Sequence, residues 1–88
     1  HKMLYVTDFY DIDQKYLDKL SDDILKNYHN VRKLNAYNNR KITNVNHMDK
    51  LQKLKASGSD CGINDAGIKM VNLKSLNASY NGKITNVN

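Results

Sequence analysis

The stretch Lys41-Ile42-Thr43-Asn44-Val45-Asn46 decides the fold, because the same six residues return at 83–88, 42 positions further on. The similarity begins earlier, since Leu-Asn-Ala at 34–36 recurs as Leu-Asn-Ala at 76–78. A chain of 88 residues is unlikely to repeat six residues in one order by chance. The duplication therefore predicts copies of one small unit that stack on each other, as in repeat proteins.

Every copy opens on the same apolar pattern: an apolar residue, a leucine three positions later and an alanine two positions beyond it. These residues are Val31, Leu34 and Ala36, then Leu51, Leu54 and Ala56, then Leu73, Leu76 and Ala78. The units accordingly span 31–50, 51–72 and 73–88, the last of them truncated. Their starts lie 20 and 22 residues apart, so the 42-residue identity covers two units of slightly different design.

Apolar and polar residues alternate at the start of each unit, as Leu34 and Ala36 do with their neighbours. This alternation predicts a short strand whose apolar side is covered when the next unit stacks beside it in parallel. Ile42, Val45 and Met48 then recur every three residues, which predicts a 3₁₀ or irregular return segment. In the unit 51–72 the apolar spacing suits a longer return with one helical turn.

The pattern resembles the leucine-rich repeat, which opens L-x-x-L-x-L-x-x-N/C, with alanine here in place of the third leucine. Residues 61–68, Cys-Gly-Ile-Asn-Asp-Ala-Gly-Ile, resemble the cysteine-containing repeat of F-box proteins, one residue short between Cys61 and Ile63. The sequence Leu-Asn-Ala-Ser at 76–79, followed by Lys-Ile-Thr-Asn-Val at 83–87, is also similar to leucine-rich-repeat proteins of giant DNA viruses. The resemblance implies an α/β solenoid of about four coils, with parallel strands on a concave side and helix or 3₁₀ segments on the convex side.

The resemblance further implies an asparagine ladder, in which side-chain amides bond the backbone of neighbouring coils. Asn39 and Asn81 lie at its position, and Ser59 stands there in the middle unit, with Cys61 close by. An unpaired buried backbone group costs about 1–3 kcal/mol, so these residues are expected to stabilise the stack.

Residues 1–30 are expected to form an N-terminal capping coil. Met3 to Thr7 reads as a strand with Leu4 and Val6 inward, and 13–28 carries apolar residues at helical spacing. Asp11 or Asp13 would cap that helix, and Ser21 would open a second short helix after a break. The alternative is a separate adaptor-binding helix.

In this register one set of strand side chains faces solvent on a shared surface. It consists of Tyr5, Thr7, Lys33, Asn35, Tyr37, Lys53, Lys55, Ser57, Ser75, Asn77 and Ser79. Leucine-rich-repeat proteins commonly bind partners there, and tyrosine is frequent among residues that dominate binding energy. The resemblance therefore implies a concave partner-binding surface.

Catalysis finds no support in the residue pattern, and we expect no enzyme, no cofactor and no metal. Cys61 with His29 or His47 is a conceivable nucleophile pair, but a buried filler is the simpler interpretation. The glycines at 58, 62 and 67 match no phosphate loop and are expected to serve turns. One cysteine allows no internal disulfide, which favours a reducing compartment: the cytoplasm, or the host cytoplasm for a viral protein. The sequence has no apolar stretch of membrane length, so we expect no membrane partner.

The leading functional hypothesis is a non-catalytic scaffold that binds a protein. The alternatives are the substrate-recognition part of a ubiquitin-ligase receptor and, less favoured, a nucleic-acid-binding module. Residues 31–88 hold ten Lys and Arg against three Asp, a balance of +7, which is the ground for the last. No polar capping element follows Val87, so we expect a fragment of a longer array, or a truncation. We expect its last coil to be either covered by another molecule, self-association included, or poorly ordered.

Overall fold

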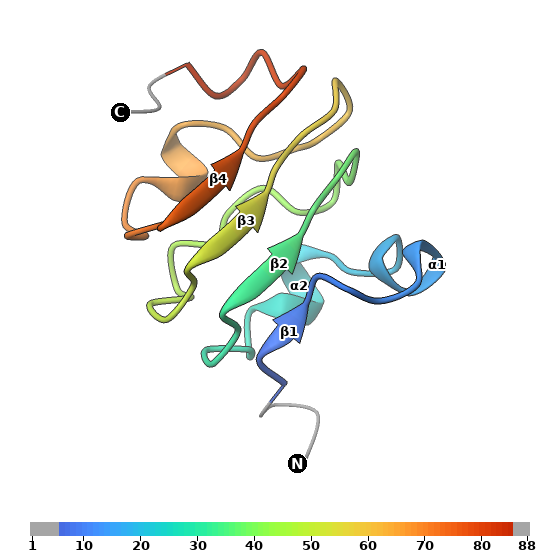
Figure 1. Ribbon diagram of the computed structural model, residues 1–88, viewed down its shortest axis with the longest axis vertical. Helices are drawn as coiled ribbons and strands as arrows, with labels where there is room; N and C mark the ends of the chain where they lie inside the picture. The colour runs from blue at the N-terminus through green and yellow to red at the C-terminus, as the bar shows by residue number, and fades with distance from the viewer. Residues whose placement is uncertain (1–5, 86–88) are drawn as a thin grey trace.

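The computed structural model describes residues 6–85 as an α/β fold built on one parallel four-stranded sheet. Strands β1 (Asp8–Phe9), β2 (Lys33–Asn35), β3 (Lys53–Lys55) and β4 (Ser75–Asn77) lie side by side in chain order (Figure 1). After each of β1, β2 and β3 the chain crosses to the opposite side of the molecule and returns beside the strand it has just left. Every inter-strand neighbour is thus also the next unit along the sequence.

The register of the sheet aligns the leucines. Leu34 pairs with Leu54, and Leu54 pairs with Leu76, so the three lie in one row across β2, β3 and β4. Leu34 and Leu54 are fully buried, as are the alanines two residues after them, Ala36 and Ala56. The prediction that these residues face inward, unit upon unit, is confirmed for β2 and β3.

The first strand lies further along the chain than predicted. β1 begins at Asp8, and Phe9 pairs with Leu34 and takes the leucine's place in the row. Val6 is half-buried against the core at the position that Val31 has in the next unit, and Thr7 is exposed. The predicted strand over 3–7 is therefore wrong at Val6 and Thr7, while Leu4 and Tyr5 lie outside the described residues. The reason is that phenylalanine stands where the other units have leucine. Val6 and Phe9 have the same spacing as Val31 and Leu34, but the match is not visible as a leucine pattern.

The apolar pattern over 13–28 forms two single turns, α1 (Gln14–Leu17) and α2 (Asp22–Leu25), so the helix is shorter than predicted, while the predicted second helix that Ser21 opens after a break is confirmed. The caps are among those predicted, since Asp13 accepts from the amide of Lys15 and Ser21 accepts from the amide of Ile24.

The break between α1 and α2 has a tertiary cause. The carbonyls of Leu17 and Leu20 accept from the side-chain amide of Asn39 at 3.2 and 3.0 Å. A continuous helix would have pointed those carbonyls along its own axis instead. Packing against the next unit therefore overrides the local helical pattern.

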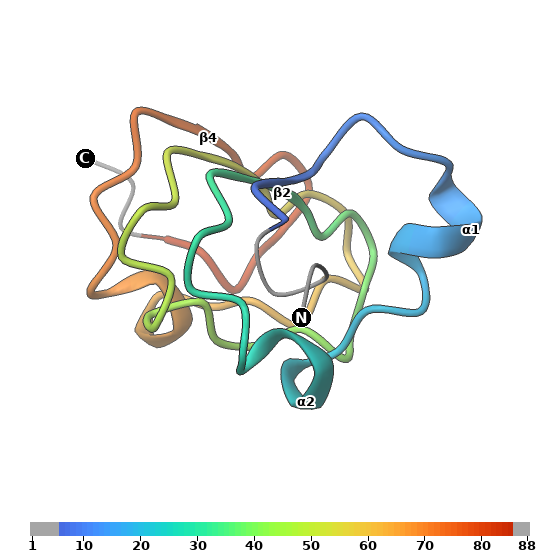
Figure 2. The same cartoon turned by 90° about the horizontal axis from the view of Figure 1, so that it is seen from below.

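The core fills the space between the strands and the return segments. Figure 2 shows the strands along one side, with α2 and the 3₁₀ turn η2 (Ala66–Ile68) along the other. Between them lie fully buried side chains of the returns, namely Ile42, Val45, Met48, Cys61 and Ile63. Complete burial of one such aliphatic side chain is worth about 1.5–3 kcal/mol. At the first end of the stack, the rings of Phe9 and Tyr28 meet edge to face at 5.3 Å.

The returns have the forms that the spacing predicted. Residues 41–46 contain no helical turn, and Ile42 and Val45 reach the core from an irregular path. The return of unit 51–72 is the longer one and contains η2 as its single helical turn.

Candidate functional site

The outward side chains of the sheet form one surface. Lys33, Lys53 and Ser75 are register partners along one row, and Asn35, Lys55 and Asn77 are partners along the next. We use the name strand face for this surface, which consists of Tyr10, Lys33, Asn35, Tyr37, Lys53, Lys55, Ser75 and Asn77. None of these eight side chains is fully buried. The structure therefore brings together most of the residues predicted to face a partner.

Two lysines of the strand face are seated on tyrosine rings. The Nζ of Lys53 lies 4.6 Å from the ring centroid of Tyr10, and the Nζ of Lys55 lies 5.4 Å from that of Tyr37. Both distances suit cation–π attraction. Sequence reasoning missed Tyr10, because the first strand was placed at 3–7. With β1 at Asp8–Phe9, Tyr10 follows Phe9 as Asn35 follows Leu34 and belongs to the same surface.

The two asparagines of the strand face also shape the chain. The Oδ1 of Asn35 accepts from the amide of Tyr37, and the Oδ1 of Asn77 accepts from the amide of Ser79, both at 3.0 Å. In each case the side-chain oxygen bonds the backbone amide two residues further along the chain, which forms a local turn. The side-chain oxygen is therefore engaged, and the amide N–H groups are the donors left for other contacts.

Ser57 does not belong to the strand face, although the sequence placed it there. It is buried, and its hydroxyl has no hydrogen-bond partner among the described residues. Tyr5 lies outside the described residues, and Ser79 is exposed beyond the end of β4. Ser57 keeps the register of the sheet but lies between two neighbouring segments, since its carbonyl accepts from the amide of Asn38 and the next amide, of Gly58, donates to the carbonyl of Ser79. Its short side chain is therefore covered from both sides.

Buried asparagine side chains join two of the units, 31–50 and 73–88, each to the unit before it. Asn39 donates to the carbonyls of Leu17 and Leu20, and its Oδ1 accepts from the amide of Lys41 at 2.9 Å. Asn81 repeats this arrangement, donating to the carbonyls of Ala56 and Ile63 at 2.8 and 3.0 Å. Both side chains are buried. The predicted ladder is confirmed at these two positions.

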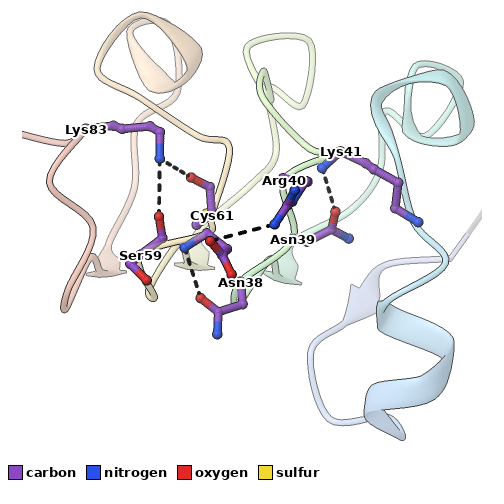
Figure 3. Close-up of polar contacts among 8 residues, drawn as sticks. Asn38, Asn39, Arg40, Lys41, Ser59, Cys61 and Lys83 are labelled. Carbon is purple, nitrogen blue, oxygen red and sulfur yellow. Dashed lines mark hydrogen bonds and ion pairs between the residues drawn. The ribbon is translucent and has the colours of Figure 1, made fainter.

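Ser59 is not a rung of the ladder, because it is exposed. Cys61 occupies the place instead: its amide bonds the carbonyl of Gly58 three residues back, as the amide of Asn39 bonds that of Ala36. Figure 3 shows the carbonyls of Ser59 and Cys61 turned toward the ammonium of Lys83, which donates to them at 3.4 and 3.1 Å.

The repeated hexapeptide contributes a second contact to the preceding unit. Thr43 bonds the carboxylate of Asp22 with both its amide and its hydroxyl, and Thr85 bonds Asp65 in the same way. The duplicated Lys-Ile-Thr is thus an interface between units, which explains why it is repeated. Sequence reasoning missed this pairing, although the two aspartates lie 43 positions apart, nearly the same spacing as the threonines.

Cys61 is buried, and burial raises the pKa of its thiol above the ordinary value of 9.0. The backbone near Ile63 and the charge of Lys83 oppose this rise of the pKa and are weaker. The thiolate is the nucleophile, so a buried, protonated thiol is unreactive. This supports the interpretation of Cys61 as a packing residue.

We expect Ellman's reagent to label Cys61 of the folded protein only as fast as the protein opens, and at once in denaturant. The pKa of the Cys61 thiol is higher in the folded protein than in the unfolded chain, where it is about 9.0. The unfolded chain therefore loses this proton first as the pH rises, and the free energy of unfolding should fall above about pH 9. Rapid labelling without denaturant at neutral pH would contradict the burial of this thiol.

The described residues hold no group of three or more His, Cys, Asp or Glu side chains that is suited to a metal ion. His29 and His47 contact each other edge to face at 5.5 Å, and the Nε2 of His47 lies 2.7 Å from the carbonyl of Leu25.

Over residues 6–85, no helix is long and apolar enough to cross a membrane.

The last unit keeps part of its apolar side open. Leu73, Leu76 and Ala78 are half-buried, whereas Leu51, Leu54 and Ala56, their counterparts in the preceding unit, are buried. An open groove runs along β4 between these residues and Val71. Coverage of this side, by another molecule or by self-association, stays a prediction, and Val87 lies outside the described residues.

The chain was compared with protein-family models, with curated proteins and with solved structures, and it matches none of them. The register of the strands, the ladder and the strand face therefore carry the functional argument.

Proposed function

We propose that this chain is a solenoid module of the leucine-rich-repeat type that binds a protein partner on its strand face. The parallel strands in sequence order, the inward leucine row and the asparagine rungs support the solenoid. Residues 1–30 would be its capping coil, and the strand face would be its concave side.

One observation carries the binding role: polar side chains stand in straight rows on a backbone that the ladder holds in place. A surface on rigid elements presents its groups at fixed spacing, which lowers the entropy lost when a partner is bound. Tyr37 is 41% exposed and lies beside the lysines, as suits a residue that anchors a protein interface.

The test is quantitative capture of partners from a cell extract by the tagged chain and by the double variant Tyr37→Ala, Lys55→Glu. The matched control is Tyr16→Ala on α1 with Lys19→Glu just after it, which removes one exposed tyrosine and reverses one exposed lysine away from the sheet. We expect the strand-face variant to lose roughly tenfold or more of its specific partner, a change of about 1.4 kcal/mol or more. Circular dichroism confirms that both variants are folded, and equal recovery by both would contradict the proposal.

A further inference from the structure

Three lysines lie next to one another at the centre of the strand face. Lys33 and Lys53 are register partners on neighbouring strands, and Lys53 and Lys55 are two residues apart on β3. Neighbouring strands are about 4.8 Å apart, and alternate residues of a strand are about 6.6 Å apart. The three lysine side chains therefore begin on one small patch of sheet.

These lysines have no carboxylate partner within the described part of the chain. The ion pairs found there join Lys26 to Asp23 and Arg40 to Asp60, both away from the strand face. Asp8 lies opposite Lys33 in the same row and carries a negative charge, but the two form no ion pair, and the Oδ1 of Asp8 accepts from the amide of Tyr10. Like charges directly opposite each other destabilise a sheet, so the cluster is unfavourable in the free protein.

Contacts with tyrosine rings hold two lysines of this cluster in place before a partner binds. Lys53 and Lys55 are half-buried, and each ammonium lies over a tyrosine ring. Long lysine side chains otherwise lose much conformational freedom when they bind, and a seated side chain loses less. Arg32 and Lys74 extend the positive charge in the row before the strands, and both are exposed.

We propose that the partner of the strand face presents an acidic, extended polypeptide segment. This inference rests on the proposed function and names the chemistry of its partner. Lys53 and Lys55 reach from β3 towards β1 and β2, where their ammonium groups lie over the rings of Tyr10 and Tyr37, so carboxylates of one segment that lies over these strands meet both. The free amide donors of Asn35 and Asn77 flank the lysines and suit carboxylate or carbonyl oxygens.

Nucleic acid fits this surface less well. Binding of single strands relies on bases stacked on open aromatic rings. An ammonium group lies over one face of each of the rings of Tyr10 and Tyr37, so a base that stacked on that face would first displace Lys53 or Lys55. Carboxylates need only the charge and the donors.

The experiment measures fluorescence anisotropy of a labelled peptide of alternating Glu and Thr, with a matched peptide of alternating Gln and Thr and a single-stranded oligothymidylate of similar length. The variant is Lys53→Gln, Lys55→Gln. The α1 control is Lys15→Gln on that helix with Lys19→Gln just after it; Lys15 likewise lies over a tyrosine, at 5.3 Å from the ring centroid of Tyr16. Titrations at low salt and at about 150 mM salt show whether the binding is electrostatic.

We expect the Glu peptide to bind more tightly than the Gln peptide, with affinity that falls as salt rises. The strand-face variant should lose about tenfold in affinity and the α1 control far less. Equal binding of the two peptides, equal losses in the two variants, or tighter binding of the oligothymidylate would each overturn the acidic partner. If one of these occurs while extract capture still depends on Tyr37 and Lys55, the binding role stands and only the acidic chemistry fails.

Discussion

Gly67→Ala is expected to lower the free energy of unfolding by about 1–3 kcal/mol, the usual cost of forcing an added methyl group into a packed interior. A Cβ at this position would meet the backbone carbonyl oxygen of Thr43 far inside contact distance, with the carbonyl carbon at 3.1 Å. No side-chain rotation relieves a clash with backbone. Shifting Gly67 away would strain the hydrogen bond of 2.9 Å from the amide of Val45 to its carbonyl. Urea unfolding followed by circular dichroism measures the loss.

Gly82→Ala is the matched control, because a Cβ there meets nothing within 4 Å. Its stability should stay the same or rise by about 0.4–1 kcal/mol, since alanine restricts the unfolded chain. Equal losses in the two variants would show that the return segments of units 31–50 and 51–72 do not pack as closely as the structure places them.

The contrast between these glycines also corrects the expectation that the glycine cluster serves turns. Gly58 does so, since its φ of 96° is a conformation that side chains disfavour. Gly62 and Gly67 lie instead where the backbone of the neighbouring unit approaches, at the carbonyls of Arg40 and Thr43. A single sequence does not distinguish a turn from a close approach, because both call for glycine.

The inward register was predictable because it depends on local alternation alone. Leu34 and Leu54 had to share one side of their strands, and equal spacing within each unit aligned them. The first unit was not predictable in this way, since Phe9 replaces the leucine and Asp11 stands where the repeat has alanine. The break before Ser21 was predictable from its capping pattern, but the shortness of α1 was not, because it depends on Asn39 of the next unit, which bonds the carbonyls of Leu17 and Leu20 at the break.

The candidate site also contains features that depend on local alternation, which were predictable, and features that depend on tertiary contacts, which were not. Lys33, Lys53 and Lys55 follow from strand alternation and were predicted to face outward. The seating of Lys53 on Tyr10 was not predictable, because the contact passes from β3 across β2 to the end of β1 and depends on the twist and spacing of the sheet. Ser59 was misplaced by the one inserted residue, which moves the equivalent of Asn39 to Cys61, and Ser57 was misplaced because neighbouring segments cover its short side chain.

Asn39→Ala is expected to lower the free energy of unfolding by roughly 3 kcal/mol, since it leaves buried backbone groups without partners at about 1–3 kcal/mol each. The carbonyl of Leu20 and the amide of Lys41 lose the partners the structure gives them, and the carbonyl of Leu17 keeps only the amide of Leu20. Small domains have about 5–15 kcal/mol in total, so the change should be visible as a large shift of the urea midpoint. Asn44→Ala is the control, because Asn44 is exposed and bonds only the nearby amide of Asn46.

Asn81→Ala removes the same bonds from the last unit and should act more locally. Hydrogen exchange of the Ala56 and Gly58 amides reports on this, because they bond the carbonyls of Asn77 and Ser79 in that unit. We expect their protection to fall in Asn81→Ala while the amides of Ala36 and Asn38, which bond unit 51–72, stay protected. In Asn39→Ala all four should exchange faster, because the bonds lost there join the first two units of the stack. If Asn39→Ala behaves like Asn44→Ala, the rungs do not hold the units together, and the rigidity on which the strand face depends has another source.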